Sequence, residues 1–176
     1  MKRFRFSTPV KILIFYLFFM LLNYLYKFFP NGLTMIFSGI NESVYQHMKI
    51  AFYSYSFTAM IEYGVRKKEI QSFQRFFYSR LFTVVFLPLI IITVYLISPL
   101  LFGKIESIAG EVIWANVALL TSIIIAVLVE EQMEKSDFSK PLRWVLIFLV
   151  LISLAEFLTF NYRLPWFDIL ATPPGW

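Results

Sequence analysis

The chain has 176 residues, of which 59% are hydrophobic, 20% are aromatic and only 15% are charged, and its formal net charge is +5. A soluble domain carries roughly 25% charged and 45–50% apolar residues, so a soluble core of this length cannot bury this much apolar surface. The composition therefore excludes a soluble globular domain and predicts an integral membrane protein. The sequence has no cysteine, which excludes disulfides, thiol catalysis and cysteine-ligated metals.

The first apolar stretch, near residues 10–29, follows a basic start, "MKRFRFSTPVKILIF", as the core of a secretory signal does. The stretch is longer than a signal core, it ends in bulky aromatic residues, and it has no small-x-small cleavage site. We therefore expect a first transmembrane helix that is retained in the protein.

Four further apolar stretches lie near residues 43–65, 78–101, 109–130 and 141–160. Each approaches the roughly 20 residues that a helix needs to cross the hydrocarbon of a bilayer. Their apolar residues are continuous rather than alternating, which is not the pattern of a transmembrane β-barrel. The sequence thus predicts an all-α integral membrane protein, a single domain over residues 1–176 built as a bundle of about five transmembrane helices.

Lysine and arginine predict the orientation, because positive charges gather on the cytoplasmic side of membrane proteins. With five spans, twelve of these residues fall on the side of the N-terminus and three on the other side. The twelve are Lys2, Arg3, Arg5, Lys11, Arg66, Lys67, Lys68, Arg75, Arg80, Lys135, Lys140 and Arg143. The three are Lys27, Lys104 and Arg163, while Lys49 lies inside the second stretch. We expect a plasma-membrane protein with a cytoplasmic N-terminus and an extracytoplasmic C-terminus, and no nucleic-acid partner.

Polar residues cluster where the second stretch begins, in the run "NESVYQHMK". Asn41 or Ser43 is placed to cap a helix, and Glu42 in the first turn suits the positive end of the helix dipole. Capping alone is one explanation of these three residues. His47 and Lys49 lie farther into the membrane, where two explanations stay open. They either reach back to the headgroups or belong to a polar sector that faces other polar groups.

Two more polar residues are predicted at the same depth as His47 and Lys49. At 1.5 Å per residue, Asn116 and Glu156 also lie roughly one or two turns below the outer surface. An isolated carboxylate at this depth is costly, so Glu156 should be protonated or paired with Lys49 or His47, as a structural ion pair or as a catalytic acid. The candidate ligand-binding residues are Asn41, Glu42, Ser43, His47, Lys49, Asn116, Glu156 and Asp168. If the protein is an enzyme, the candidate catalytic residues are His47, Glu42 and Glu156, but the sequence assigns no reaction.

Other chemistries have weaker support in the sequence. Glu42, His47, Glu156 and Asp168 include metal-ligating residue types, but there is no HExxH motif and no second histidine, so we expect no metal and no cofactor. No Gly-rich phosphate loop and no GxSxG nucleophile motif occurs. Ser43 and His47 have the spacing of a nucleophile and its base, but this spacing is common by chance.

Acidic residues at the other end of the predicted bundle have simpler interpretations. Glu62 lies four residues before Arg66, a spacing that predicts an ion pair on the surface of a helix. Glu130 and Glu131 close the fourth stretch, where we expect both to be solvated at the cytoplasmic surface.

The run "NESVYQHMK" resembles the N-E-S-x-W-E-H-x-K motif of a family of small bacterial multi-spanning membrane proteins, a domain of unknown function. The matching residues are Asn41, Glu42, Ser43, His47 and Lys49. Tyr45 replaces the tryptophan and Gln46 replaces the second glutamate, which speaks against a role that needs two acids on this turn. "LPWFD" resembles the family's proline–aromatic–aspartate tail, with one residue fewer before Asp168. The resemblance implies a membrane location and a shared site, without an established activity.

Two functional hypotheses of different classes follow. In the first, an extracytoplasmic-facing site binds a polar ligand or a lipid headgroup, Lys49 and the helix amides hold negative charge, and His47 exchanges a proton. This hypothesis predicts that His47, Lys49 and Glu156 point into one cavity. In the second, the chain is a structural or accessory subunit, its polar residues join its helices, and a partner membrane protein or a second copy packs on it. Transport has less support, because the sequence has no inverted repeat.

Overall fold

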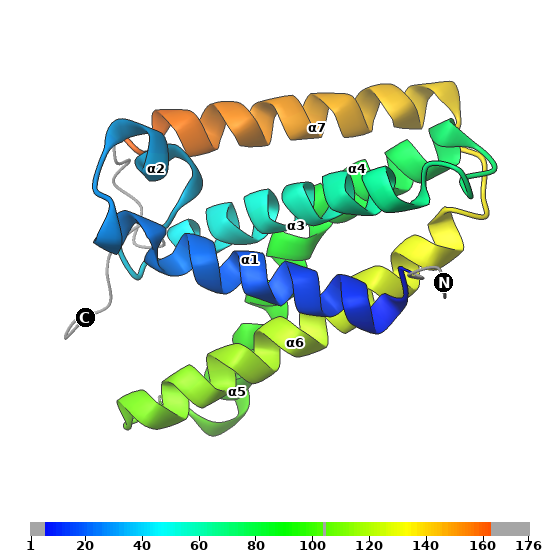
Figure 1. Cartoon of the computed structure of the whole chain (residues 1–176). Coiled ribbons are helices and arrows are strands. Elements are labelled where there is room, and N and C mark those ends of the chain that lie inside the picture. Colours follow the sequence, from blue (N-terminus) through cyan, green and yellow to red (C-terminus); the bar gives the residue numbers. More distant parts are fainter. Residues whose placement is uncertain (1–5, 104, 163–176) are drawn as a thin grey trace, which may run out of the picture.

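Helices form all the regular structure in the part of the chain that this computed structural model describes, residues 6–103 and 105–162 (Figure 1). They are α1 (Thr8–Phe28), α2 (Gly32–Phe37), α3 (Val44–Arg66), α4 (Phe73–Tyr95), α5 (Ile97–Phe102), α6 (Ile108–Met133) and α7 (Lys140–Thr159). The long helices α1, α3, α4, α6 and α7 correspond to the five predicted stretches, and α5 continues the third of them. The predicted all-helical fold class is confirmed.

Local sequence explains where several helices begin. The side chains of Ser43, Ser72 and Ser107 each accept a hydrogen bond from the backbone amide three residues later, which satisfies one amide of the first turn. Asn41 in turn accepts a hydrogen bond from the backbone amide of Ser43 at 3.0 Å. The predicted cap is therefore Ser43, and Asn41 positions it.

Four helices are long and apolar enough to cross a membrane: α1, α4 together with α5, α6 and α7. Helix α3 has 23 residues but is less apolar, and α1 and α4 pack against it. Its buried residues include Gln46, Lys49, Thr58 and Glu62. These polar groups therefore face protein rather than lipid, as polar groups inside a bilayer do.

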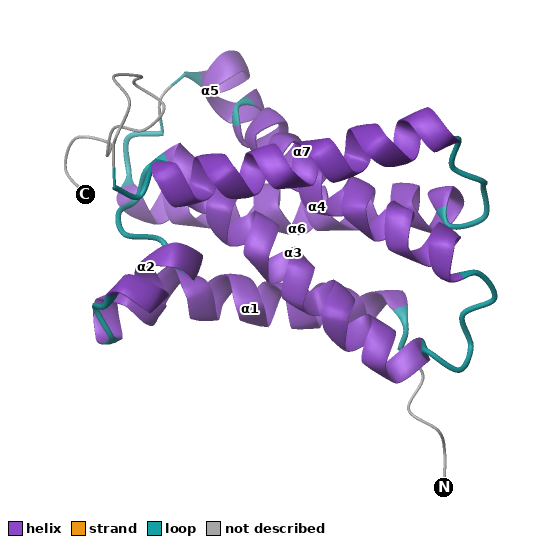
Figure 2. Ribbon diagram, turned by 90° about the horizontal axis from the view of Figure 1, so that it is seen from above, coloured by secondary structure: helices purple, strands orange, loops and turns teal. Residues whose placement is uncertain are grey.

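The bundle has two ends, which the helices define clearly in both views (Figures 1 and 2). The start of α1, the α3–α4 connection and the α6–α7 connection lie at one end, which we call the proximal end. Helices α2 and α5 lie at the other, the distal end. Helix α4 packs against α3, α6 and α7, whereas α1 and α6 diverge toward the distal end (Figure 1).

An apolar core fills the middle of the bundle. Phe15 of α1, Tyr55 of α3, Leu87 of α4 and Ile123 of α6 have no exposed surface. The ring of Phe15 packs against the ring of Tyr55, with 6.1 Å between their centroids. This core separates the polar groups of the distal end from those of the proximal end.

Candidate functional site

A pocket of about 380 Å³, which we call the distal pocket, is lined by residues of α1, α3, α4 and α6 and by Glu42 before α3. Helices α1 and α6 diverge toward this end of the bundle (Figure 1). The residues that line the pocket are Phe19, Met20, Asn23, Tyr24, Lys27, Glu42, Val44, His47, Met48, Ile91, Ile92, Tyr95, Glu111, Val112, Ala115, Asn116 and Leu119. The volume falls in the range of roughly 300–1,000 Å³ that small-molecule pockets occupy. The pocket is therefore large enough for a ligand or for part of a lipid.

Charged and apolar residues occupy different depths of the distal pocket. Lys27 lies in the last turn of α1, Glu42 directly precedes α3, and Glu111 lies in the first turn of α6. Residues farther along these helices, such as Phe19 and Leu119, are apolar and buried. The pocket thus has a charged mouth toward the distal end and an apolar interior.

His47 is held by hydrogen bonding at the mouth of the pocket. Its Nδ1 lies 2.9 Å from the backbone carbonyl oxygen of Ser43, to which it donates. The other ring nitrogen, Nε2, lies 3.6 Å from Oε2 of Glu42, and Oε1 of Glu42 accepts a hydrogen bond of 3.0 Å from Lys27. In a neutral ring Nε2 is an acceptor that faces a second acceptor, the carboxylate. A proton on Nε2 turns the two groups into an ion pair, and a ligand donor beside them can bond either acceptor.

The opposite wall of the pocket is also held by hydrogen bonds. The hydroxyl of Tyr95 donates to Oε1 of Glu111 at 2.9 Å, and the indole of Trp114 donates to the backbone carbonyl of Tyr95 at 2.9 Å. Below them, the hydroxyl of Tyr16 donates to Oδ1 of Asn116 at 2.7 Å and joins α1 to α6. The polar groups of the pocket are therefore held in place before a ligand binds.

The structure brings three of the sequence-predicted site residues to one pocket. Glu42, His47 and Asn116 line it, although they come from opposite walls. Asn41 and Ser43 do not line it, but they fix the start of the helix that carries His47.

The other predicted site residues lie elsewhere. Lys49 is fully buried outside the pocket, where Nζ donates to the backbone carbonyl of Met35 and to Oδ1 of Asn161. Glu156 is exposed on α7, and its carboxylate has no hydrogen bond or ion pair to any residue that the structure describes. Asp168 lies outside the described residues. The expectation of one cavity shared by His47, Lys49 and Glu156 is therefore wrong.

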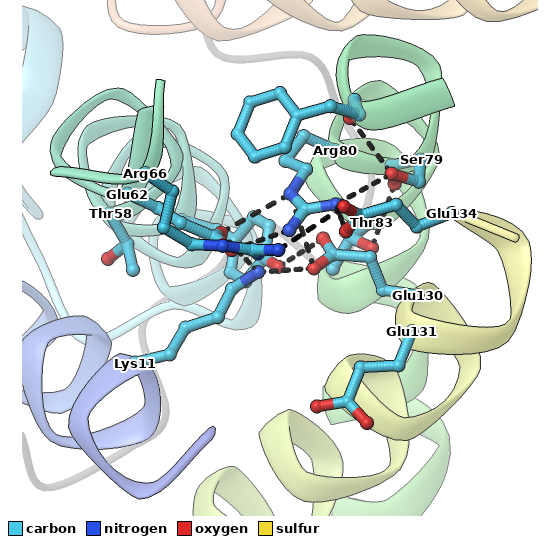
Figure 3. Close-up of polar contacts among 12 residues, drawn as sticks. Lys11, Thr58, Glu62, Arg66, Ser79, Arg80, Thr83, Glu130, Glu131 and Glu134 are labelled. Atoms are coloured by element: carbon cyan, nitrogen blue, oxygen red, sulfur yellow. Dashed lines mark hydrogen bonds and ion pairs between the residues drawn. The ribbon is translucent and has the colours of Figure 1, made fainter. Parts of the chain in front are cut away.

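A second polar cluster, the proximal network, lies inside the bundle near its proximal end (Figure 3). Its members are Lys11, Tyr55, Glu62, Arg66, Arg80, Glu130 and Glu134. Lys11 Nζ lies 2.6 Å from Glu62 and also contacts Glu130. Arg80 donates to Glu62 from Nε at 3.2 Å, and Tyr55 donates to Glu130. Three cations balance three carboxylates, so the network carries no net charge and joins α1, α3, α4 and α6.

The sequence interpretation missed this network. The prediction that Glu130 is solvated is wrong, because the residue is only 1% exposed. Glu62 does pair with Arg66, as predicted, but its carboxylate is also buried. Lys11 and Arg80, taken as surface charges, are buried as well. The sequence does hold one clue to the network. Its four buried charged residues each lie inside an apolar stretch, within a few turns of the same end of the bundle: Lys11, Glu62, Arg80 and Glu130.

The proximal network reaches solvent at a polar surface depression of about 720 Å³. Arg66 and Glu134 contribute to its lining. Arg75, which also lines it, binds Asp137 of the α6–α7 connection with two hydrogen bonds of 2.8 and 3.1 Å. Hydrogen bonding to Arg75 lowers the pKa of Asp137 from its ordinary value. These contacts tie the α6–α7 connection to the start of α4.

The distal pocket is the candidate site. The charged members of the proximal network are all paired with one another, whereas Nε2 of His47 and Oε2 of Glu42 lie 3.6 Å apart without a hydrogen bond between them. In the described part of the chain, no group of three or more His, Asp or Glu residues is arranged to hold a metal ion. Comparison of the chain with protein-family models, with curated proteins and with solved structures finds no match.

Proposed function

We propose that this chain is a plasma-membrane protein whose distal pocket binds a lipid-class amphiphile from the extracytoplasmic leaflet. The polar head of the ligand contacts Glu42, His47 and Lys27, and its apolar part packs against the interior of the pocket. The observation that carries the proposal is the pocket itself, which combines a charged mouth with an apolar interior between two diverging membrane-type helices. A soluble polar ligand would leave that apolar wall without a partner.

The polar groups at the mouth favour a particular kind of headgroup. Among the described residues, the pocket lining contains one cationic side chain, Lys27, and two carboxylates, Glu42 and Glu111. Nε2 of His47 and Oε2 of Glu42 are both acceptors when the imidazole is neutral. A headgroup that carries hydroxyl or ammonium donors can bond these acceptors, so this class of ligand fits better than a headgroup with only acceptors.

The distribution of charge supports an orientation with the distal end outside. Lys11 and Arg80 belong to the buried network, so we leave them out of the count of positive residues on each side of the membrane. Ten of the twelve positive residues on the N-terminal side remain, against three on the other side. The positive-inside rule then places the proximal end in the cytoplasm, with five helices crossing the membrane.

A tryptophan placed inside the pocket tests the proposal. Ala115 lines the pocket and is itself exposed, so Ala115→Trp fills the cavity without disturbing the core. Protein purified in a mild detergent is examined by native mass spectrometry, which counts bound lipids. We expect wild type to retain a lipid and Ala115→Trp to lose it, because the indole occupies the space of the ligand.

The matched control is Ala155→Trp, which places the same side chain on an exposed position of α7 that does not line the pocket. This variant should retain the lipid. A lipid at a hundredfold excess over its Kd adds about 2.7 kcal/mol to the free energy of unfolding, so wild type and the control should also melt above Ala115→Trp. Equal lipid retention by all three proteins would contradict the proposal and favour the accessory-subunit alternative.

A further inference from the structure

Lys49 is a buried cation on a different face of α3 from His47. The two residues are two positions apart, which is about 200° around a helix with 3.6 residues per turn. Lys49 has no exposed surface, and Nζ donates to the carbonyl of Met35 at 2.9 Å and to Oδ1 of Asn161 at 2.7 Å. Both acceptors are neutral. Among the described residues, no carboxylate lies within ion-pair distance of Lys49.

The other two buried cations that the structure describes, Lys11 and Arg80, lie beside carboxylates. Lys11 contacts both Glu62 and Glu130. Arg80 contacts Glu62, Glu130 and Glu134. Because a buried charge is costly unless an opposite charge is near, the chain places carboxylates beside these two cations. Lys49 lacks such a carboxylate in the described part of the chain, so no described carboxylate pairs with its charge.

Residues close to Lys49 on α3, or in the segments that it contacts, also carry buried polar atoms without a hydrogen-bond partner among the described residues. Buried polar atoms without a partner in the described part of the chain include Nε2 of Gln46, the hydroxyl of Tyr45, Nδ2 of Asn161 and the hydroxyl of Ser38. Gln46 and Tyr45 lie three and four residues before Lys49, which places them on its side of α3. The side-chain oxygen of Asn161 accepts from Lys49, so its amide nitrogen remains free. Ser38 directly follows α2, the helix whose carbonyl at Met35 contacts Lys49.

The chemistry of these groups is that of an anion site. An ammonium, two amide nitrogens and two hydroxyls are all donors, and a group with several acceptor oxygens and a negative charge satisfies them together. Water would satisfy single donors but would leave the charge of Lys49 without an opposite charge.

We propose that Lys49 and these donors form a site for an oxyanion, that is, for a phosphate or a carboxylate group. The group comes from a ligand that carries such an oxyanion, either an anionic phospholipid or free phosphate. The site is separate from the distal pocket, since Lys49 does not line that pocket, and it does not rest on the function proposed above.

The test measures Tm in detergent for wild type and Lys49→Met, with inorganic phosphate or with micelles containing an anionic or a zwitterionic phospholipid. Phosphate or the anionic lipid should raise the Tm of wild type by roughly 5–10 °C near saturation, and the zwitterionic lipid should not. Lys49→Met should show no such rise. The matched control Lys68→Met removes an exposed cation that lines neither pocket and should keep the response.

The proposal is overturned if wild type responds neither to phosphate nor to the anionic lipid, or if Lys49→Met responds as wild type does. A wild type without a response overturns the proposal even if Lys49→Met does not fold. Because Ala115→Trp should leave the anion response intact, failure of this site and failure of the lipid pocket are distinguishable.

Discussion

Glu62→Gln is expected to lower the free energy of unfolding by about 3–5 kcal/mol, which is the usual effect of removing one partner from a buried ion pair. Glu62 is only 1% exposed and contacts Lys11, Arg66 and Arg80. The substitution leaves the network with three cations and two carboxylates. Unfolding in mixed micelles of increasing SDS content, followed by circular dichroism, measures the change.

A matched control and a double variant separate the charge effect from the loss of a side chain. Glu131→Gln makes the same substitution at an exposed position outside the network and should cost little. Lys11→Met should destabilise the protein as Glu62→Gln does, but the combined variant restores the balance of charge. We expect the double variant to be more stable than the sum of the single effects implies, as coupled neighbours are. A Glu62→Gln variant no less stable than Glu131→Gln would show that the network does not hold the helices together.

Phe15→Ala is expected to cost about 3–5 kcal/mol, the range for truncating a buried aromatic residue to alanine. Phe15 has no exposed surface and packs against the rings of Phe19 and Tyr55. Its removal leaves a cavity between the distal pocket and the proximal network, which neither protein nor lipid fills. The same SDS unfolding assay measures the loss of stability.

Leu17→Ala provides the comparison on the same helix. Leu17 is 58% exposed and faces away from the bundle, so lipid or detergent replaces the contacts that it loses. We expect a much smaller effect than that of Phe15→Ala. Similar losses at both positions would mean that α1 is rotated about its axis relative to this structure.

The sequence predicts the helices well because their signals are local. Apolar stretches of the length of a membrane span predict α1, α6 and α7 closely. The cap at Ser43 is predictable for the same reason. A hydroxyl directly before an apolar run can cap a helix without any contact to other elements. Such features depend on neighbours in the chain and need no knowledge of how helices pack.

The faces of α3 were harder to predict because the sequence does not show which neighbour each face meets. A shared polar sector is one of the two explanations that the sequence leaves open for His47 and Lys49. Two residues apart on a helix point about 200° apart, and the structure places different elements on the two sides. His47 faces the pocket between α1 and α6, whereas Lys49 contacts Met35 and Asn161.

The proximal network depends on contacts between distant parts of the chain. Lys11 and Glu130 are 119 residues apart, and no local pattern connects them. Their depth in the predicted helices is readable from the sequence, but the rotation of each helix about its axis is not. Charge balance among buried residues at one depth is therefore the most useful clue for locating such a network.

Labelling of single introduced cysteines most directly tests the central claim, a lipid pocket that opens to the extracytoplasmic side. The chain has no cysteine of its own, so Asn23→Cys reports the pocket mouth and Glu131→Cys reports the proximal surface. A membrane-impermeant maleimide is added to intact cells and to permeabilised cells. We predict that Asn23→Cys reacts in intact cells, while Glu131→Cys reacts only after permeabilisation, and that added lipid slows the labelling of purified Asn23→Cys. The reverse pattern of access, or an Asn23→Cys rate that added lipid does not change, would contradict the claim.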